Sequence, residues 1–240
     1  MEQLANKLTD WIRKCVLDAR KAGAVVGLSG GIDSAVVAVL CKRAFPDTTL
    51  AVIMPCYSSK TDIAHAHELA QKFDIRTETV ELEAAYESLL KSFPKGKTYH
   101  KNDNLSQSNI KPRLRMVTLY YLASQLNYLV VGTGNRSEIA VGYSTKYGDG
   151  GVDILPLGNL VKKQVNELAG YLGVTREIIS KPPSAGLWEG QTDEGEMGLT
   201  YNELDRYLTT GEAGVQIKKK IESMMRASAH KRAMPPAPPF

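Results

Sequence analysis

Apolar and polar positions along the chain fall into two alternating patterns. Short segments dominated by apolar or β-branched residues predict strands at 24–28, 49–56, 75–82 and 128–134. Apolar positions at helical spacing predict helices, which cover residues 2–21, 35–45, 62–73, 113–126, 161–173, a stretch after Thr200 and residues 214–228. Strands that alternate with helices are typical of a parallel sheet covered on both faces. We therefore expect an α/β fold with a doubly wound, mostly parallel sheet of five strands.

The segments without this periodicity are predicted to be loops or a tail. Residues 92–111 and 181–198 have almost no apolar periodicity, and loops of this length inside a compact domain are usually functional or disordered. We expect both to cover the site and to become ordered when ligands bind. Residues 233–240 are rich in proline and predict a flexible tail. Because no internal repeat is visible, we expect residues 1–240 to form a single domain.

Three polar stretches directly follow predicted strands. They are SGGIDS at 29–34, MPCYSS at 54–59 and GTGNRSE at 132–138. In open parallel sheets, ligands bind beyond the carboxyl ends of the strands, where the strand order reverses. The coincidence of three such stretches predicts a nucleotide-binding crevice at this edge of the sheet.

The glycine pair in SGGIDS is suited to binding phosphate. Glycine has no Cβ, so main-chain amides can approach a ligand closely, and a helix N-terminus favours anions. The candidate phosphate ligands are the amides of Gly30, Gly31 and Ile32 and the hydroxyls of Ser29 and Ser34. Asp33 would repel phosphate unless a cation lies between them, which indicates Mg²⁺. The alternative is a tight turn in which Ser34 caps the following helix.

Composition and charge argue against several classes of protein. The net charge is +4 and the basic residues are scattered, so a nucleic-acid-binding surface is poorly supported. Cys15, Cys41 and Cys56 are odd in number and far apart, which argues against a disulfide framework or a structural zinc site. The sequence has no apolar run long enough to cross a bilayer and no Walker-A motif GxxxxGK[ST]. We therefore expect a cytoplasmic protein with no membrane or nucleic-acid partner.

The SGGIDS loop resembles the pyrophosphate-binding loop (PP-loop) of ATP pyrophosphatases, which activate a substrate by adenylation. NAD synthetases, GMP synthetases, asparagine synthetases and tRNA-thiolating enzymes share this loop, so the loop alone does not choose among them. Residues 132–165 and 181–194 are very similar to the corresponding parts of NAD synthetases, as are NIKPRLRM at 109–116 and HKR at 230–232. The resemblance to the NAD synthetase family spans nearly the whole chain.

This resemblance implies the amidation of nicotinic acid adenine dinucleotide (deamido-NAD) to NAD. A carboxylate oxygen of the substrate attacks the α-phosphorus of ATP, pyrophosphate leaves, and ammonia then displaces AMP from the acyl adenylate. We expect free ammonia as the donor, because the fold occupies the whole sequence and leaves no room for the amidase domain of glutamine-using relatives. Nothing in the sequence indicates a separate glutamine amidotransferase subunit. The resemblance also implies a homodimer and Mg²⁺.

The resemblance further implies which residues bind each ligand. ATP would contact Gly27, Leu28, Ser29, Gly30, Gly31, Ile32, Asp33, Ser34, Thr133, Lys162 and Ser184. Deamido-NAD would contact Arg113, Lys146, Asp153, His230 and Lys231. Mg²⁺ would be held by Asp33 and Glu138. The catalytic candidates are Asp33 and Asp153, the latter as the group that takes a proton from ammonium.

Several of these residues also fit an ordinary structural role. Glu138 fits a solvated residue at a helix start, and Thr133 a turn at a strand end. Lys162 fits a polar position on an amphipathic helix, and Asp153 a turn before a strand. The HKR segment fits a solvated, charged C-terminus.

Two other functions stay open at this stage. One is another PP-loop ATP pyrophosphatase, either GMP synthetase-like or tRNA-modifying; an enzyme acting on RNA would be expected to carry a basic stripe or zinc-binding cysteines. The other is a non-catalytic nucleotide-binding module, which would not need Asp33 and Glu138 together for a metal ion.

The assignment of Asp153 as proton acceptor makes a first prediction. Asp153→Asn should lower the amidation rate at saturating ammonia and leave pyrophosphate release largely intact, because only the second step needs the base. Parallel assays of NAD and pyrophosphate measure the two steps. Equal loss of both products would refute the role of Asp153.

Overall fold

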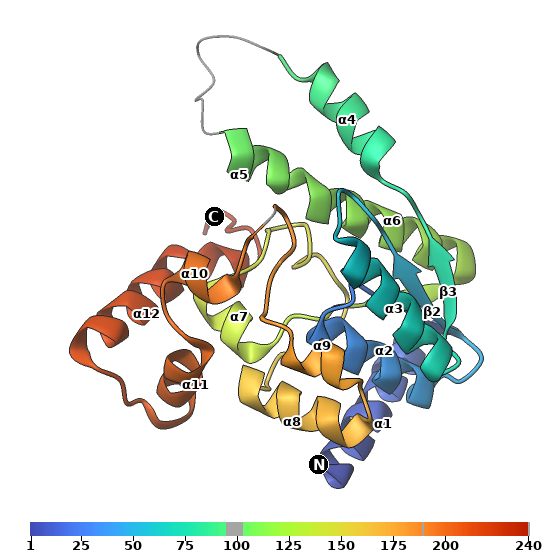
Figure 1. The fold of residues 1–240 in the computed structure, drawn as a ribbon, viewed down its shortest axis with the longest axis horizontal. Coiled ribbons are helices and arrows are strands. Elements are labelled where there is room, and N and C mark those ends of the chain that lie inside the picture. Colours follow the sequence, from blue (N-terminus) through green and yellow to red (C-terminus); the bar gives the residue numbers. More distant parts are fainter. Residues whose placement is uncertain (95–102, 189, 240) are drawn as a thin grey trace.

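A parallel sheet of four strands forms the centre of the computed structural model, which describes residues 1–94, 103–188 and 190–239 (Figure 1). The strands are β1 (Gly23–Gly27), β2 (Thr49–Ile53), β3 (Arg76–Thr79) and β4 (Tyr128–Val131), and their order in the sheet is β3-β2-β1-β4. Val25 of β1 is in register with Leu50 of β2 and Val130 of β4. The order reverses between β1 and β4, which places the expected ligand crevice at their carboxyl ends.

The helices vary in length from a single turn to seventeen residues. They are α1 (Glu2–Asp18), α2 (Ile32–Ala44), α3 (Lys60–Lys72), α4 (Glu83–Ser92), α5 (Asp103–Ser108), α6 (Ile110–Leu126), α7 (Arg136–Val141), α8 (Lys162–Leu172), α9 (Arg176–Ser180), α10 (Asp193–Met197), α11 (Tyr201–Thr210), α12 (Val215–Ala227) and the 3₁₀ helix η1 (Ala229–Lys231). Among the described helices, none is both long and apolar enough to cross a membrane.

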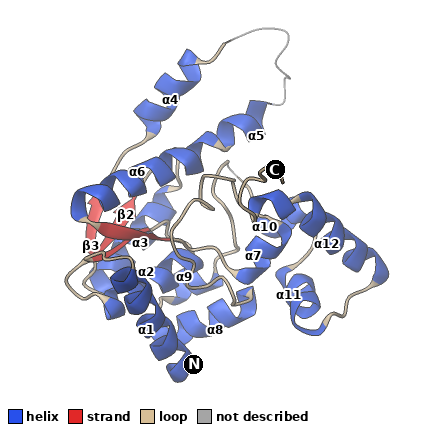
Figure 2. Cartoon of the chain, turned by 180° about the vertical axis from the view of Figure 1, so that it is seen from behind, coloured by secondary structure: helices blue, strands red, loops and turns tan. Residues whose placement is uncertain are grey.

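Two layers of helices cover the sheet. Successive residues of a strand point to opposite faces, so Val26 joins one hydrophobic core and Val25 the other. The first core lies between the sheet and helices α1, α2, α3 and α8, and the second between the sheet and helices α4 and α6. Figure 2 shows α6 on one side of the strands and α1 and α2 on the other. This cover on both faces explains why β1 is apolar at successive positions.

A third, smaller core lies beside these layers. It joins Val141 of α7 to Leu204 of α11 and Ile221 of α12. Figure 1 shows α10, α11 and α12 together at one side of the molecule. This core fixes the N-terminal end of α11, and with it Tyr201, beside the crevice.

The predicted α/β fold is confirmed, with one correction in the sheet. The sheet has four strands rather than five among the described residues. After residue 150 the chain makes one isolated parallel bridge, between Val131 and Ile154, and then turns at Pro156 and Gly158 before α8. The predicted strands at 49–56 and 75–82 are also shorter, ending at Ile53 and Thr79.

The predicted loops are wrong in part. Within 92–111 the chain forms α5 and the first residues of α6, while residues 95–102 lie outside the described part. Within 181–198 it forms α10, whose N-cap Thr192 accepts a hydrogen bond from the Gly195 amide. Helices of five or six residues have too few apolar positions to show a period, so capping residues such as Thr192 are their main signal. The tail at 233–240 stays a prediction; residues 233–239 are exposed without a helix or strand.

Gly30 makes the turn between β1 and α2 and generates a prediction. Its φ is +78°, and a Cβ at this position would lie 2.1 Å from the Asp62 carbonyl oxygen. We expect Gly30→Ala to destabilise the fold by at least about 1 kcal/mol, because of both the conformation and the clash. Gly170→Ala is the matched control: Gly170 lies in α8, and a Cβ there would have nothing within 4 Å.

The control should have the opposite effect, since alanine in an exposed helix stabilises by about 0.5–1 kcal/mol relative to glycine. Urea unfolding followed by circular dichroism measures both variants. An unchanged midpoint for Gly30→Ala would contradict the close packing of this turn against α3.

Candidate active site

A cavity of about 520 Å³ opens at the carboxyl ends of β1, β2 and β4. Its wall is made by the ends of these strands, the glycine loop after β1, the first turns of α3 and α7, the N-terminal part of α6, and the segments 142–152 and 181–196. A volume of this size is typical of sites for small molecules and cofactors. The predicted crevice therefore exists where the strand order placed it.

The glycine loop is ordered by its own serines. The Ser34 hydroxyl donates to the Gly31 carbonyl oxygen at 2.8 Å and lies 3.0 Å from the Ser29 hydroxyl. The amides of Ser29 and Gly31 donate to the Ser34 and Ser29 hydroxyl oxygens at 3.2 and 3.3 Å. Gly31 is the extended N-cap of α2, so the free amides of the first helical turn start at this loop. The loop thus has the form of an anion-binding helix N-terminus.

Three charged side chains from three different helices meet beside this loop. Lys162, only 3% exposed, places its Nζ 2.5 Å from Oδ2 of Asp33 and 3.4 Å from Oε1 of Glu138. Asn135 donates to Oδ1 of Asp33 at 2.8 Å, and its own side chain forms a capping box with Glu138 at the start of α7. Lys162 Nζ also lies 5.1 Å from the centre of the Tyr201 ring. We call Asp33, Glu138 and Lys162 the charged triad.

Burial and mutual charge change the proton affinities in this triad. Burial raises the pKa of Glu138 to about 8, and the nearby Asp33 carboxylate adds to this effect against the pull of Lys162. Burial alone would lower the pKa of Lys162, but the Asp33 and Glu138 carboxylates raise it above its ordinary value. Lys162 is therefore a permanent cation between two acidic groups.

The two carboxylates of the triad fit a magnesium ion. Mg²⁺ prefers oxygen ligands and is usually held by one or two carboxylates together with substrate phosphates and water. Within residues 1–94, 103–188 and 190–239, no group of three or more His, Cys, Asp or Glu side chains is arranged to hold a metal ion on its own. Asp33 and Glu138 supply carboxylates from only two residues, so a Mg²⁺ ion there would take its other oxygen ligands from water or a bound phosphate.

Comparison with known protein families identifies the family of this chain. The family model for NAD synthase matches residues 4–235. The chain belongs to the NAD synthase family. The resemblance found in the sequence is thereby confirmed.

Similar proteins support this membership along the full length. The NH₃-dependent NAD⁺ synthetase of Carboxydothermus hydrogenoformans is 52% identical, over 99% of this chain and 97% of the relative. The solved structure of NMN synthetase from Francisella tularensis has a TM-score of 0.93 and 40% identity, covering 100% of this chain and 98% of that one. NH₃-dependent NAD synthetase from Campylobacter jejuni has a TM-score of 0.79 and 31% identity, covering 98% and 97%.

The residues predicted to bind ATP are brought together in this member of the NAD synthase family. All of them except Gly30 line the cavity, and Gly30 lies within the loop that forms its wall. The Ser184 hydroxyl accepts a hydrogen bond from the Gly186 amide at 3.1 Å, which shapes the turn of the opposite wall. Thr133 and Lys162 line the cavity after β4 and at the start of α8; Lys162 is buried rather than solvated, and the role of Thr133 stays a prediction.

The residues predicted to bind deamido-NAD lie mostly elsewhere. Lys231 lines both the main cavity and a second hollow of about 300 Å³, which Lys146 also lines. Lys146 Nζ donates to the His230 carbonyl oxygen at 2.9 Å, and the Lys146 carbonyl oxygen accepts from Arg113 at 3.3 Å. These four residues form a continuous group beside the main cavity.

Asp153 is placed apart from that group. Its Oδ2 accepts a hydrogen bond from the Val130 amide at 2.8 Å, and its Oδ1 accepts one from the Tyr120 hydroxyl at 2.9 Å. It is not among the residues that line either hollow. In this conformation Asp153 ties the segment after residue 150 to β4 and α6; its catalytic role stays a prediction.

A network in the segment 181–198 was missed in the sequence. The Tyr201 hydroxyl donates to Oδ2 of Asp193 at 2.9 Å, and Oε2 of Glu196 accepts from the Tyr143 hydroxyl and from Gln191, both at 2.8 Å. Asp193 lines the cavity but is only 4% exposed, and burial raises its pKa. The acidic run DEGE within an otherwise glycine-rich and proline-rich segment was the available signal.

The raised pKa of Glu138 predicts a pH dependence of stability. Between the ordinary glutamate pKa of 4.5 and about 8, the folded protein keeps a proton that the unfolded chain has lost. The free energy of unfolding should therefore fall as pH rises through this window, by up to about 1.4 kcal/mol per pH unit from this one group.

Glu138→Gln removes the titration and keeps the side-chain shape, so its stability should fall less steeply over the same window. Urea unfolding at pH 5, 6, 7 and 8 without nucleotide compares the two proteins. Parallel curves for the wild type and the variant would contradict a raised pKa at Glu138.

Proposed function

We propose that this chain forms NAD from deamido-NAD, ATP and ammonia, with AMP and pyrophosphate as the other products. The observation that carries the proposal is the charged triad beside a glycine loop at a helix N-terminus, where a triphosphate and a divalent cation complement the existing charges. The names of relatives 43–52% identical over nearly the whole chain specify NH₃-dependent NAD⁺ synthetases.

The triphosphate of ATP would lie against the glycine loop. The first-turn amides of α2 and the hydroxyls of Ser29 and Ser34 would donate to its phosphate oxygens. Asp33 and Glu138 would hold Mg²⁺, which supplies neutralising charge at those oxygens when bound. Lys162 lies between these carboxylates and carries three donors, so it can turn to the α-phosphate, where the substrate carboxylate attacks.

The walls of the cavity would protect the activated intermediate. An acyl adenylate is hydrolysed by water, so its site must be closed while ammonia arrives. Lys111, buried at the N-terminal end of α6, donates to the Leu187 carbonyl oxygen at 2.8 Å. The Glu196 hydrogen bonds hold the other end of the same segment. Segment 181–198 is thus fixed at two points over the site and would exclude water.

The dinucleotide would extend from the main cavity toward the second hollow. Lys231 and Lys146 line this path, and their ammonium groups would suit the pyrophosphate of deamido-NAD; Arg113 and His230 are hydrogen-bonded to Lys146 beside it. Asp153 could take a proton from ammonium only if its bonds to Val130 and Tyr120 rearranged. Only its contact with the substrate rests on the resemblance to the family pattern; its role as proton acceptor is a separate hypothesis.

A mononucleotide substrate is the second candidate. The structure with a TM-score of 0.93 to this chain is named an NMN synthetase, which indicates the amidated mononucleotide as product in that protein. Nicotinic acid mononucleotide has the same reacting carboxylate, and would use the main cavity without the second hollow. The relatives named NAD⁺ synthetases at higher sequence identity favour the dinucleotide.

Assembly and location are also proposed. We expect a homodimer, because α6 exposes Val117 and Tyr121, which are 59% and 63% exposed in the single chain. Sedimentation would then give twice the monomer mass of 26.3 kDa. We expect one domain with residues 233–240 as its tail. A reducing cytoplasm suits the free cysteines Cys15, Cys41 and Cys56.

Incubation with ATP, Mg²⁺, ammonium and deamido-NAD tests the proposal. NAD, AMP and pyrophosphate should form in equal amounts, and omission of Mg²⁺ should abolish the reaction. Parallel reactions replace deamido-NAD by nicotinic acid mononucleotide, or ammonium by glutamine. Faster turnover of the mononucleotide would favour the second candidate, and ATP binding without any amide product would favour a non-catalytic module.

A further inference from the structure

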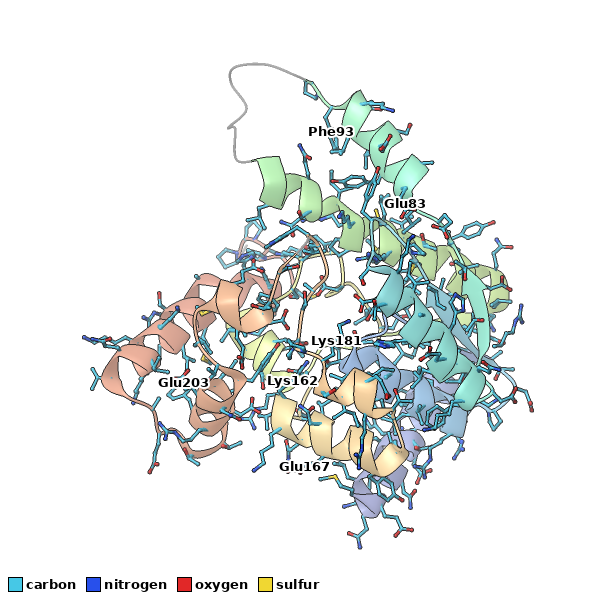
Figure 3. The ribbon with its side chains drawn as sticks, in the orientation of Figure 1. Glu83, Phe93, Lys162, Glu167, Lys181 and Glu203 are labelled. Carbon is cyan, nitrogen blue, oxygen red and sulfur yellow. The ribbon has the colours of Figure 1, made fainter. Side chains whose placement is uncertain are left out.

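A second lysine, outside the charged triad, faces the glycine loop. Lys181 directly follows α9, and its Nζ forms an ion pair with Oδ1 of Asp62 in the first turn of α3. Both residues line the main cavity, and their side chains are 30% and 20% exposed. Figure 3 labels Lys181 and Lys162 near the centre of the molecule. No residue of this pair belongs to the predicted ATP-binding set.

The backbone places this pair against the glycine loop. The Asp62 carbonyl oxygen packs on Gly30 so closely that a Cβ there would lie 2.1 Å from it. Gly30 is at the centre of the loop that would hold the triphosphate. The Asp62 side chain, and with it Lys181, therefore borders this loop on the side of α3, whereas the charged triad comes from α2, α7 and α8.

Lys181 is fixed in position by its neighbours in the chain. Ile178, in the helix just before it, is 2% exposed and belongs to the main core. Pro182 and Pro183 follow and restrict the backbone, and the Pro183 carbonyl oxygen accepts a hydrogen bond from the Asp193 amide at 3.0 Å. A lysine held in this way loses less conformational freedom on binding a ligand than a lysine on a free loop.

Among the described residues, Lys181 has fewer protein partners than the other basic side chains of the cavity wall, so it can bind a ligand. The other basic side chains in the wall have several protein partners: Lys162 contacts two carboxylates, Arg115 donates to the Met54 carbonyl oxygen and the Ser58 hydroxyl, and Lys231 donates to two carbonyl oxygens. Among the described residues, Asp62 is the hydrogen-bond partner of Lys181. An ammonium group has three donors, so two can reach a ligand while Asp62 accepts the third.

We propose that Lys181 binds the β- and γ-phosphates of ATP and the released pyrophosphate, with Asp62 as its positioning residue. The proposal rests on the proposed function. Negative charge accumulates on pyrophosphate as its bond to the α-phosphorus breaks, so a cation near the β-phosphate stabilises the departing group. Lys181 then stabilises the departing pyrophosphate, and Lys162 stabilises the α-phosphate.

Binding of ATP, pyrophosphate and AMP separates this role from a structural one. Calorimetric titration of the full-length protein in Mg²⁺ uses ATP, pyrophosphate and AMP in turn. Lys181→Met should weaken binding of ATP and pyrophosphate about tenfold or more and leave AMP binding within about twofold, because AMP lacks the two phosphates in question. Lys181→Arg keeps the charge and should restore most of the affinity for pyrophosphate.

A matched control removes a similar lysine contact of α3 that lies outside the cavity. Lys72 lies on α3, as Asp62 does. It donates to the Gly173 carbonyl oxygen at 2.7 Å and links α3 to the turn before α9. Lys72→Met should leave all three affinities unchanged. Asp62→Asn should weaken ATP binding less than Lys181→Met does, since the cation remains but is less well oriented.

Each outcome supports or overturns the assignment. Equal loss of AMP and ATP binding in Lys181→Met, or the same loss in Lys72→Met, would show that Lys181 only supports the fold. Unchanged pyrophosphate binding in Lys181→Met would overturn the proposal directly. If the wild-type protein binds ATP but forms no amide product, the proposed function fails while the role of Lys181 in binding still stands.

Discussion

The site depends on one electrostatic arrangement: a buried lysine held between two carboxylates. Asp33, Glu138 and Lys162 come from α2, α7 and α8, which are far apart in sequence, and their contact joins the glycine loop to the rest of the sheet edge. Taking these charges out of water is costly, and the cost is offset only while all three are together. The arrangement therefore specifies how the three helices approach one another even before a ligand arrives, and it leaves the carboxylates pointing at the cavity that the loop borders.

The same arrangement suits an exchange of partners when nucleotide binds. Without ligand, Lys162 balances the charge of Asp33, while Glu138 keeps its proton near neutral pH because burial raises its pKa to about 8. A phosphate group alone would add negative charge to an acidic wall, and a divalent cation alone would meet the charge of the lysine. With both bound, these charges would balance: Asp33 and Glu138 would hold the cation, and Lys162 could bind a phosphate oxygen. Charge balance would thus favour joint binding of the proposed Mg²⁺ and nucleotide over binding of either one.

The sequence predicts interactions between residues close along the chain better than interactions between distant segments. The glycine loop is local, and its SGGIDS pattern after a strand was enough to place it; the parallel sheet then fixed where Glu138 emerges. The resemblance implied that Lys162 contacts ATP, but its contact with both carboxylates was not predicted, because helical periodicity treats Lys162 as a surface position. The contacts of Asp153 were also not predicted. Its bonds to Val130 and Tyr120 depend on the path of the chain after β4, where the chain makes an isolated bridge instead of a fifth strand. The pairing of Tyr201 with Asp193 also depends on a third core that no single helix pattern reveals.

The proposed site has two parts, and only one of them is built into the core of the fold. Similarity of fold alone therefore does not decide between the two candidate substrates. The proposed ATP side is built from strand ends and helix starts within the main core, so the packing of that core holds the loop and the triad in place. The second hollow is lined instead by the segment 144–150 and residues 231–235, which attach to the fold through a few bonds such as those of Lys231 to the Gly142 and Ser144 carbonyl oxygens. A mononucleotide and a dinucleotide differ only in the portion that would reach this hollow. In the proposed binding mode, discrimination between them would come from residues that line this hollow, such as Lys146 and Lys231.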